Sequence, residues 1–269
     1  MFRSVHTAMA AAAALVVLTS CSGPARSSNV GSPEFYWQAA TETYAAGNYT
    51  KTIDHLDRLI ETRNTYSGLA LPWSLVLTSG VASGYMELAD DYDSGARVNG
   101  TQAARFRRKA AEYRTLASGM ALHFAENVDK LGRLPYDTVP LAFGLPKGGG
   151  GVPPVLSRIA NGIPLSPGDA DAAQSLTVER GVLLAVCLAA GAPNDIARTA
   201  TILNEASAAA PRETFGKALA RMLDLEAGLY GRGKLDEPEK RAVLQQRSQN
   251  ALAWAAQSGT ALLIRPAGK

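Results

Sequence analysis

Apolar residues recur at intervals of three or four along most of the chain, which is the spacing of one face of an α-helix. The clearest case spans residues 101–130. Its apolar stripe comprises Phe106, Ala110, Tyr113, Ala117, Met120, Phe124 and Val128. The pattern predicts one long helix that buries this stripe. On the opposite side the basic run Arg105–Lys109 has two interpretations, a solvated face or a surface that meets anionic lipid or an acidic partner.

Residues 64–86 carry no charge and include large apolar side chains such as Trp73. Their number suits a membrane-spanning helix, but serine, threonine and glycine dilute the segment. A central helix of a soluble body is therefore favoured, with Pro72 in its first turn and small residues that let other helices approach. Four acids are expected to end this helix at the solvent: Glu87, Asp90, Asp91 and Asp93. The alternative there, a metal site, lacks EF-hand spacing.

Prolines and glycines crowd residues 131–168 and prevent a long helix. At most a short helix is expected, near Val155–Ala160. The glycine run after Lys147 lacks the order of a P-loop, so nucleotide binding is not expected. This long loop separates two helical halves, residues 34–130 and 169–258.

The second half repeats the helical spacing in two further antiparallel pairs. Helices are expected to open at Asp169, at Asn194 or Asp195, and near Glu237. Cys187 lies inside an apolar run and is expected to be a small buried residue rather than a nucleophile. Strand patterns are almost absent, so the predicted fold class is all-α.

The N-terminus has the pattern of an export signal, with Arg3 followed by an uncharged run that reaches Leu18. The residues Leu-Thr-Ser before Cys21 complete a motif that resembles the lipobox of bacterial lipoproteins. The resemblance implies cleavage before Cys21 and acylation of that cysteine. Residues 1–20 are then the signal peptide and residues 21–33 a lipidated flexible tether. The serine after the cysteine favours the outer membrane, with the body facing the periplasm. An ordinary secretory signal is the alternative.

The inventory of reactive side chains is small. The formal charge of +3 is too weak for a nucleic-acid-binding surface. Once the signal is removed, only His55 and His123 remain as histidines, and no hydrolase, metalloprotease or dinucleotide motif is present. We therefore expect no enzymatic activity, no cofactor and no metal, with His123 in a structural role. A lysozyme-like muramidase, which needs only a pair of acids, is the enzymatic alternative.

The segment Glu34–Asn64 resembles one tetratricopeptide repeat. The matching positions are Ala40 at the helix crossing, Gly47 at the turn, Tyr49 after it, and Ile53, Leu56 and Ile60 on the second helix. Thr52 and Asn64 depart from the pattern. Such a unit cannot bury its apolar face alone. The resemblance thus implies antiparallel helix pairs in a right-handed stack, interrupted by the long loop, within one domain of residues 34–269. A generic helix hairpin is the alternative.

The lipid anchor, the tether and the repeat-like helices are together similar to the lipoprotein T component of TRAP transporters. The similarity rests on Cys21, the unit Glu34–Asn64 and the predicted helices Leu69–Tyr85 and Phe106–Val128. It implies a protein- or ligand-binding scaffold that is accessory to solute uptake, with a periplasmic solute-binding protein as partner. The alternative is an envelope assembly factor that binds outer-membrane or peptidoglycan proteins.

Aromatic residues outside the apolar stripes are the candidates for a binding surface. They are Tyr36, Trp37, Tyr66, Tyr136 and Phe143. In a tetratricopeptide-like pair the first helix lines the concave side, which favours Tyr36 or Trp37. The alternative for each ring is a place in the core.

Overall fold

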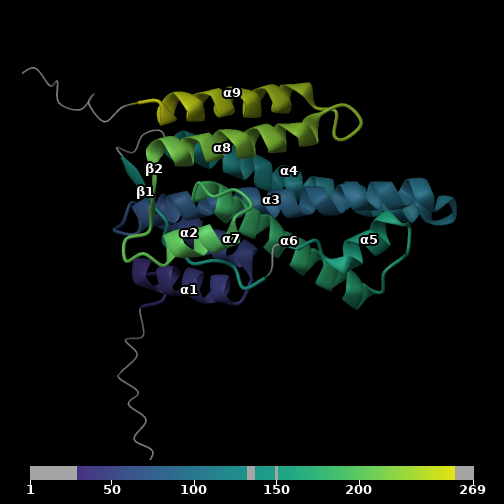
Figure 1. Cartoon of the computed structure of the whole chain (residues 1–269), viewed down its shortest axis with the longest axis horizontal. Coiled ribbons are helices and arrows are strands. Elements are labelled where there is room, and N and C mark those ends of the chain that lie inside the picture. Colours follow the sequence, from purple (N-terminus) through teal and green to yellow (C-terminus); the bar gives the residue numbers. More distant parts are fainter. Residues whose placement is uncertain (1–28, 132–136, 149–150, 258–269) are drawn as a thin grey trace, which may run out of the picture.

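The computed structural model describes residues 29–131, 137–148 and 151–257, and most of them belong to helices (Figure 1). The elements in chain order are α1 (Pro33–Ala45), α2 (Tyr49–Glu61), α3 (Ser67–Val98), η1 (Gly100–Gln102), α4 (Ala103–Leu131), β1 (Thr138–Pro140), α5 (Pro154–Ala160), α6 (Pro167–Ala189), α7 (Ile196–Leu203), β2 (Ala209–Pro211), α8 (Arg212–Ala227), η2 (Gly228–Tyr230) and α9 (Pro238–Ala255). The all-α class is confirmed. Residues 1–20, Cys21 and Tyr136 lie outside the described residues.

The first two helices begin close to where the sequence predicts. Ser32 caps α1 by accepting a hydrogen bond from the Phe35 amide at 3.2 Å. Asn48 caps α2 by accepting one from the Lys51 amide at 3.3 Å. Between them Gly47 has a φ of +75°, which glycine adopts without steric cost, so the chain can reverse within a short turn.

α3 is the central helix and contacts α2, α4, α5, α6 and α8. Two predictions about it are wrong, because it starts at Ser67, ahead of Pro72, and continues past the acids to Val98. Its start is fixed by the Ser67 hydroxyl, which accepts a hydrogen bond from the Asn64 amide at 2.9 Å. The acids do not end the helix because cations of other elements hold three of them: Glu87 pairs with Arg180, Asp90 with Lys234 and Asp93 with Arg114.

α4 returns along α3 and confirms the strongest predicted helix. Of its predicted stripe only Met120 is not fully buried. Aromatic rings fill the space between the two helices. Tyr92 of α3 stacks on Tyr113 of α4 with centroids 5.7 Å apart and packs against Phe106 at 5.6 Å. These contacts hold α3 and α4 together as a long hairpin.

α6 crosses α3 at backbone contact distance. A Cβ placed on Gly80 would lie 2.5 Å from the Val182 Cα, and one on Gly84 would lie 2.6 Å from the Val178 Cα. The small residues of α3 therefore do let a neighbouring helix approach, as predicted. Among the described helices, α6 is the one long and apolar enough to cross a membrane, and 56% of its most apolar window is buried inside the body.

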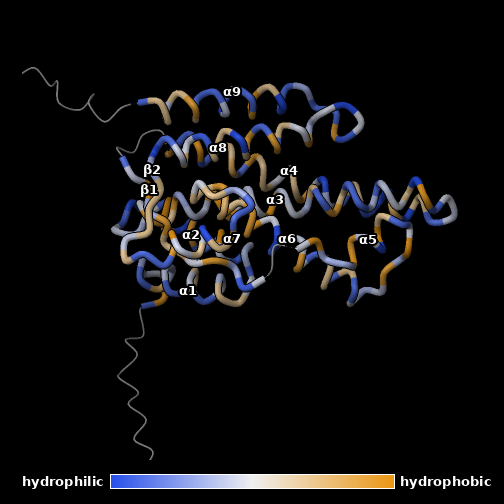
Figure 2. Tube along the Cα trace, viewed as in Figure 1, coloured by the Kyte–Doolittle hydropathy of each residue, from blue (hydrophilic) through white to orange (hydrophobic). Residues whose placement is uncertain are grey.

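The predicted helix starts of the second half are partly right. Asp195 caps α7 by accepting a hydrogen bond from the Arg198 amide at 2.9 Å, and α9 begins directly after Glu237. Asp169 does not open α6. Ser166 is the cap, and it accepts a hydrogen bond from the Asp169 amide at 3.2 Å. Hydrophilic and hydrophobic residues are interspersed along α8 and α9, which pair side by side (Figure 2).

A short strand pair ties the long loop to the second half, and the sequence does not predict it. β1 and β2 pair antiparallel, with Val139 opposite Ala210. Each strand has three residues, too few for an alternating pattern to emerge. The remaining regular element of the loop is α5, which matches the predicted short helix. Cys187 is buried, as expected.

Candidate functional site

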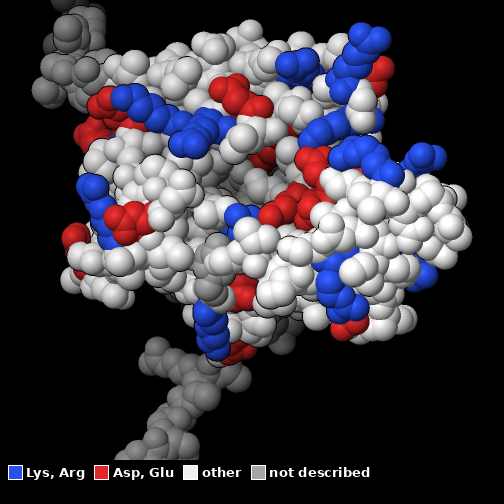
Figure 3. Space-filling view, turned by 45° about the vertical axis from the view of Figure 1, so that its right-hand side comes forward, with Lys and Arg blue, Asp and Glu red and all other residues white. Residues whose placement is uncertain are grey.

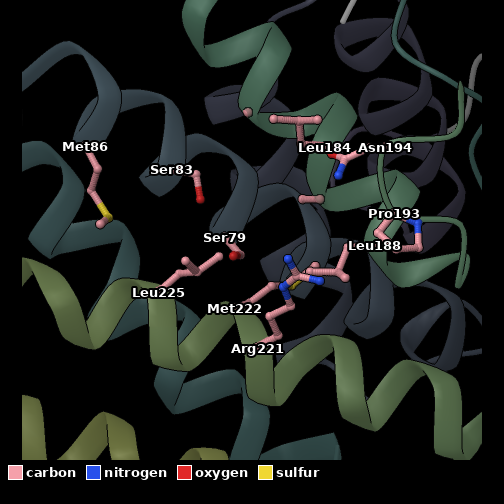
Figure 4. Close-up of a pocket in the computed structure, with 12 residues that line it drawn as sticks. Ser79, Ser83, Met86, Leu184, Leu188, Pro193, Asn194, Arg221, Met222 and Leu225 are labelled. Carbon is pink, nitrogen blue, oxygen red and sulfur yellow. The ribbon is translucent and has the colours of Figure 1, made fainter. Parts of the chain in front are cut away.

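A groove of about 330 Å³ opens between α3, α6 and α8 (Figure 4). Its walls are mostly apolar and come from all three helices and the turn after α6: Met86, Leu184, Ala185, Leu188, Pro193, Met222 and Leu225. Leu225 keeps 55% of its surface exposed, so the groove is open to solvent. Its volume lies at the lower end of the range of small-molecule sites. The groove is therefore large enough for a small organic ligand.

Polar groups occur at two levels of the groove. Ser79 and Ser83 of α3 present hydroxyls at its base, whereas Asn194 and Arg221 lie at its edge. Arg221 is exposed, and its side chain extends from α8 toward Leu188 of α6 (Figure 4). No ion pair or hydrogen bond joins it to another of the residues that the structure describes. A guanidinium of this kind is free to bind an anionic group such as a carboxylate or phosphate.

A buried acid lies behind the base of the groove. Glu226 of α8 is fully buried next to Ser79, and neither of its carboxyl oxygens makes a well-formed hydrogen bond with the described residues. Burial raises its pKa well above the ordinary value of 4.5, and the Ser79 hydroxyl offsets part of that effect. Burial therefore favours the protonated, uncharged form of Glu226 in the folded protein more than in the unfolded chain.

A second polar cluster joins α2, α3 and α4. Asp57 accepts a hydrogen bond from the Ser74 hydroxyl at 3.1 Å and pairs with His123 Nε2 at 3.1 Å. The Asn127 amide reaches the same hydroxyl at 3.4 Å. The residue types are those of a serine hydrolase, but the aspartate lies between the serine and the histidine. Since Ser74 is also buried, this network holds helices together and does not present a nucleophile.

A third cluster surrounds the acids of α3. Arg180 of α6 donates to both carboxyl oxygens of Glu87, at 2.7 and 2.6 Å. Asp91 is half-buried beside them, and burial together with the negative charges of Glu87 and Asp90 raises its pKa to about 6. Acids and cations stand next to one another around a central hollow on the face drawn in Figure 3. No group of three His, Cys, Asp or Glu suited to a metal occurs within the described residues.

Three of the five aromatic candidates come together. Trp37 lies between Tyr66 and Phe143, with ring centroids 5.1 and 5.4 Å apart and near-parallel planes. Phe143 continues into the core, where its ring meets Trp73 at 4.9 Å and Tyr44 at 5.0 Å. Phe143 is thus a buried packing residue that fixes the start of the long loop. Trp37 and Tyr66 remain half-buried, so part of each ring faces the solvent.

The other two candidates are not in this stack. Tyr36 packs instead against His55 of α2, with centroids 6.2 Å apart, and against Phe35 at 5.4 Å. Tyr136 falls outside the described residues. The predicted surface is therefore divided between a stacked trio and a separate ring on α1.

Sequence reasoning did not find the groove. Ser79 and Ser83 were visible only as diluting residues in an apolar helix, and Arg221 interrupts no pattern in α8. Arg221 directly precedes Met222 in the sequence, but a single arginine beside an apolar residue is a weak indication of a binding site. Most such arginines are solvated surface charges. The groove depends on three helices that lie far apart in the chain.

Comparisons of the chain with protein-family models, with curated proteins and with solved structures find no match. The function is therefore inferred from the residues themselves, from the N-terminal motif and from the geometry of the groove.

Proposed function

We propose that this chain is a membrane-anchored envelope lipoprotein whose helical body binds a small amphipathic ligand between α3, α6 and α8. The observation that carries the proposal is the pairing of apolar walls with one unpaired cation, Arg221, at the edge of the groove. Apolar walls favour an aliphatic body, and a guanidinium favours a carboxylate or phosphate. The volume of about 330 Å³ accommodates roughly eleven carbon-sized groups at roughly 30 Å³ each.

The groove supports binding more than catalysis. Its base offers two hydroxyls, from Ser79 and Ser83, which are groups that orient a ligand, and the buried Glu226 lies behind this base. The other carboxyl with a raised pKa, Asp91, shares its cluster with the Glu87–Arg180 ion pair. Neither acid lines the groove. A scaffold that holds a ligand is therefore the function that this arrangement favours.

The anchor belongs to the same proposal. The lipobox-like residues before Cys21 and the polar stretch that follows support a protein that is held at the periplasmic face of the outer membrane by lipid. A body that is tethered in this way captures or hands over a ligand close to the membrane.

We extend the proposal to the architecture and the partner. A tetratricopeptide-like unit at α1–α2 is supported by the positive φ of Gly47, by the buried Ala40 and by the packing of α2 on α3. On this view the chain is similar to the T component of TRAP transporters and cooperates with a periplasmic solute-binding protein. The central position of α3 differs from a linear array, so the repeat-like part of the proposal is restricted to α1–α4.

The ligand proposal is tested by calorimetric titration with three probes. Decanoate has a chain and a charge, decanamide has the chain alone, and acetate has the charge alone. We expect decanoate to bind more tightly than decanamide and acetate not to bind. Arg221→Gln should weaken decanoate binding about tenfold and leave decanamide binding unchanged, because one charge-assisted contact is lost.

The matched control is Arg241→Gln, which removes another exposed arginine, on α9. It should bind both probes as the parent does. Equal behaviour of the Arg221 and Arg241 variants, or no binding of either ten-carbon probe, would show that the groove is not the site.

The anchor is tested separately by Cys21→Ala in cells grown with labelled palmitate. We expect the parent to carry the label and to fractionate with membranes, and the variant to lose the label. Equal labelling of the two proteins would rule out acylation at Cys21, whatever the groove binds.

A further inference from the structure

The tip of the α3–α4 hairpin, residues 94–111, is strongly and exclusively basic. It holds five Lys or Arg residues and no Asp or Glu, namely Arg97, Arg105, Arg107, Arg108 and Lys109. The tip projects along the long axis of the molecule past α8 and α9 (Figure 1).

Most of this charge is not neutralised within the molecule. Lys109 pairs with Glu112 at 2.6 Å, and Arg97 donates to the Ser94 hydroxyl. Arg105, Arg107 and Arg108 are exposed, and within the described ranges they have no ion-pair partner. Three guanidinium groups within about one helical turn thus remain free for an external anion.

Two acids next to the tip are already engaged in ion pairs. Asp93 pairs with Arg114 on the side of the main body. Asp169, at the start of α6, pairs with Arg158 of α5 at 3.6 Å. Neither ion pair leaves a carboxylate to compensate the arginines of α4, so the tip keeps an excess of positive charge.

Exposed aliphatic side chains lie at the same end. Val98 is 66% exposed and Ile163 is 46% exposed. Asn99 links their segments, since its side-chain amide donates to the Gly162 carbonyl at 2.8 Å. Exposed apolar side chains are hydrated unfavourably, whereas the headgroup region of a bilayer accommodates apolar side chains and arginines side by side.

We infer that the basic tip docks on an anionic phospholipid surface. Each Lys or Arg near such a surface strengthens binding, and guanidinium groups bind phosphate with two parallel hydrogen bonds. The end of a helical hairpin meets a flat headgroup layer without a matching groove, which favours lipid over an acidic peptide. The contact gives the body a second point of attachment and a fixed orientation at the membrane.

The experiment measures co-sedimentation of the full chain with vesicles of phosphatidylcholine, with and without phosphatidylglycerol. The parent and the variant that are compared both carry Cys21→Ala, so that no lipid anchor contributes to binding. The variant is the triple substitution Arg105→Gln, Arg107→Gln and Arg108→Gln. We expect it to bind the anionic vesicles about tenfold or more weakly than the parent at low salt, and to bind neutral vesicles equally.

The matched control replaces three exposed arginines elsewhere, Arg63, Arg232 and Arg241, with glutamine. It should bind the anionic vesicles as the parent does. Val98→Ser should weaken binding to anionic vesicles a few-fold without changing its salt dependence, because it removes an apolar contact. Equal binding by the two triple variants overturns the inference. So does a tip variant that loses binding to a polyglutamate column but keeps its binding to anionic vesicles, since that result assigns the surface to an acidic protein. Neither result bears on ligand binding in the groove.

Discussion

His123 Nε2 lies 3.1 Å from Asp57 Oδ2, and this contact joins α4 to α2 across the central helix. The hydrogen bond that His123 donates to Asp57 raises the pKa of His123 above its ordinary value of 6.5, although burial acts in the opposite direction. The charged form of His123 is therefore favoured in the folded protein.

The first prediction concerns this pair and pH. A histidine whose folded pKa is raised contributes stability that is fully present below pH 6.5 and is lost as pH rises through the folded pKa. Asp57→Asn should remove this contribution, about 0.5 to 1 kcal/mol for a partly exposed pair. Urea unfolding of the parent and the variant between pH 5 and pH 8 measures this contribution, because the range includes the pKa of a free histidine, about 6.5. The control is Glu61→Gln, which removes one partner of the exposed Arg58–Glu61 ion pair. If the stability of Asp57→Asn depended on pH as that of the parent does, the prediction would be contradicted.

The second prediction concerns the crossing of α3 and α6. Gly80→Ala places a methyl group against the Val182 backbone and should lower the free energy of unfolding by about 1 to 3 kcal/mol. Gly119→Ala is the control, because a Cβ at this exposed position of α4 meets nothing within 4 Å. It should raise stability by about 0.5 to 1 kcal/mol through helix propensity. Thermal unfolding of both variants decides, and a stable Gly80→Ala protein would mean that the helices are further apart.

The third prediction separates packing from recognition among the aromatic rings. Phe143→Ala should cost about 3 to 5 kcal/mol of stability, because its ring is buried among Trp37, Tyr44 and Trp73. Trp37→Ala should cost less, since that ring is half-exposed. Each variant is melted and then used as bait for periplasmic proteins. If Trp37→Ala kept the parental stability but bound a partner more weakly by about 2 kcal/mol or more of binding free energy, the Trp37 ring would be part of a binding surface. Loss of stability without loss of a partner would leave it as packing.

The fourth prediction concerns the buried acid. The pKa of Glu226 is raised by folding, so its unfavourable contribution grows as pH rises above the unfolded value of about 4.5. Glu226→Gln cannot ionise, and its stability should fall less between acid and neutral pH than that of the parent. Asp224→Asn, an exposed acid on the same helix, is the control. Parallel stability curves for the parent and the Glu226 variant would show that this carboxyl does not titrate with folding.

Local signals in the sequence were sufficient for the helices that bury one stripe. Phe106, Ala110 and Tyr113 predict α4, and Ser32 marks the start of α1. These features depend on neighbours within one or two turns, so a pattern in the chain contains them.

Other features depend on partners that are distant in the sequence. The acids of α3 look like a solvated helix end until Arg180 and Lys234 are brought to them by folding. The groove is likewise built by Ser79, Leu188 and Arg221, which have no common local signal. Three of the aromatic candidates, Trp37, Tyr66 and Phe143, lie together in the structure. Large rings gather where helices meet, so this contact follows from packing.

The central position of α3 also determines how the molecule unfolds. In a linear array of helical repeats each unit touches only its neighbours, and the ends can unravel first. Here α3 packs against elements of both halves, and Asp90 is joined to Lys234, 144 residues away. Removal of either half exposes one face of the same helix, so we expect the described body to melt in one cooperative transition. Contacts of such long range also slow folding, because α3 completes its packing only after α8 has been synthesised.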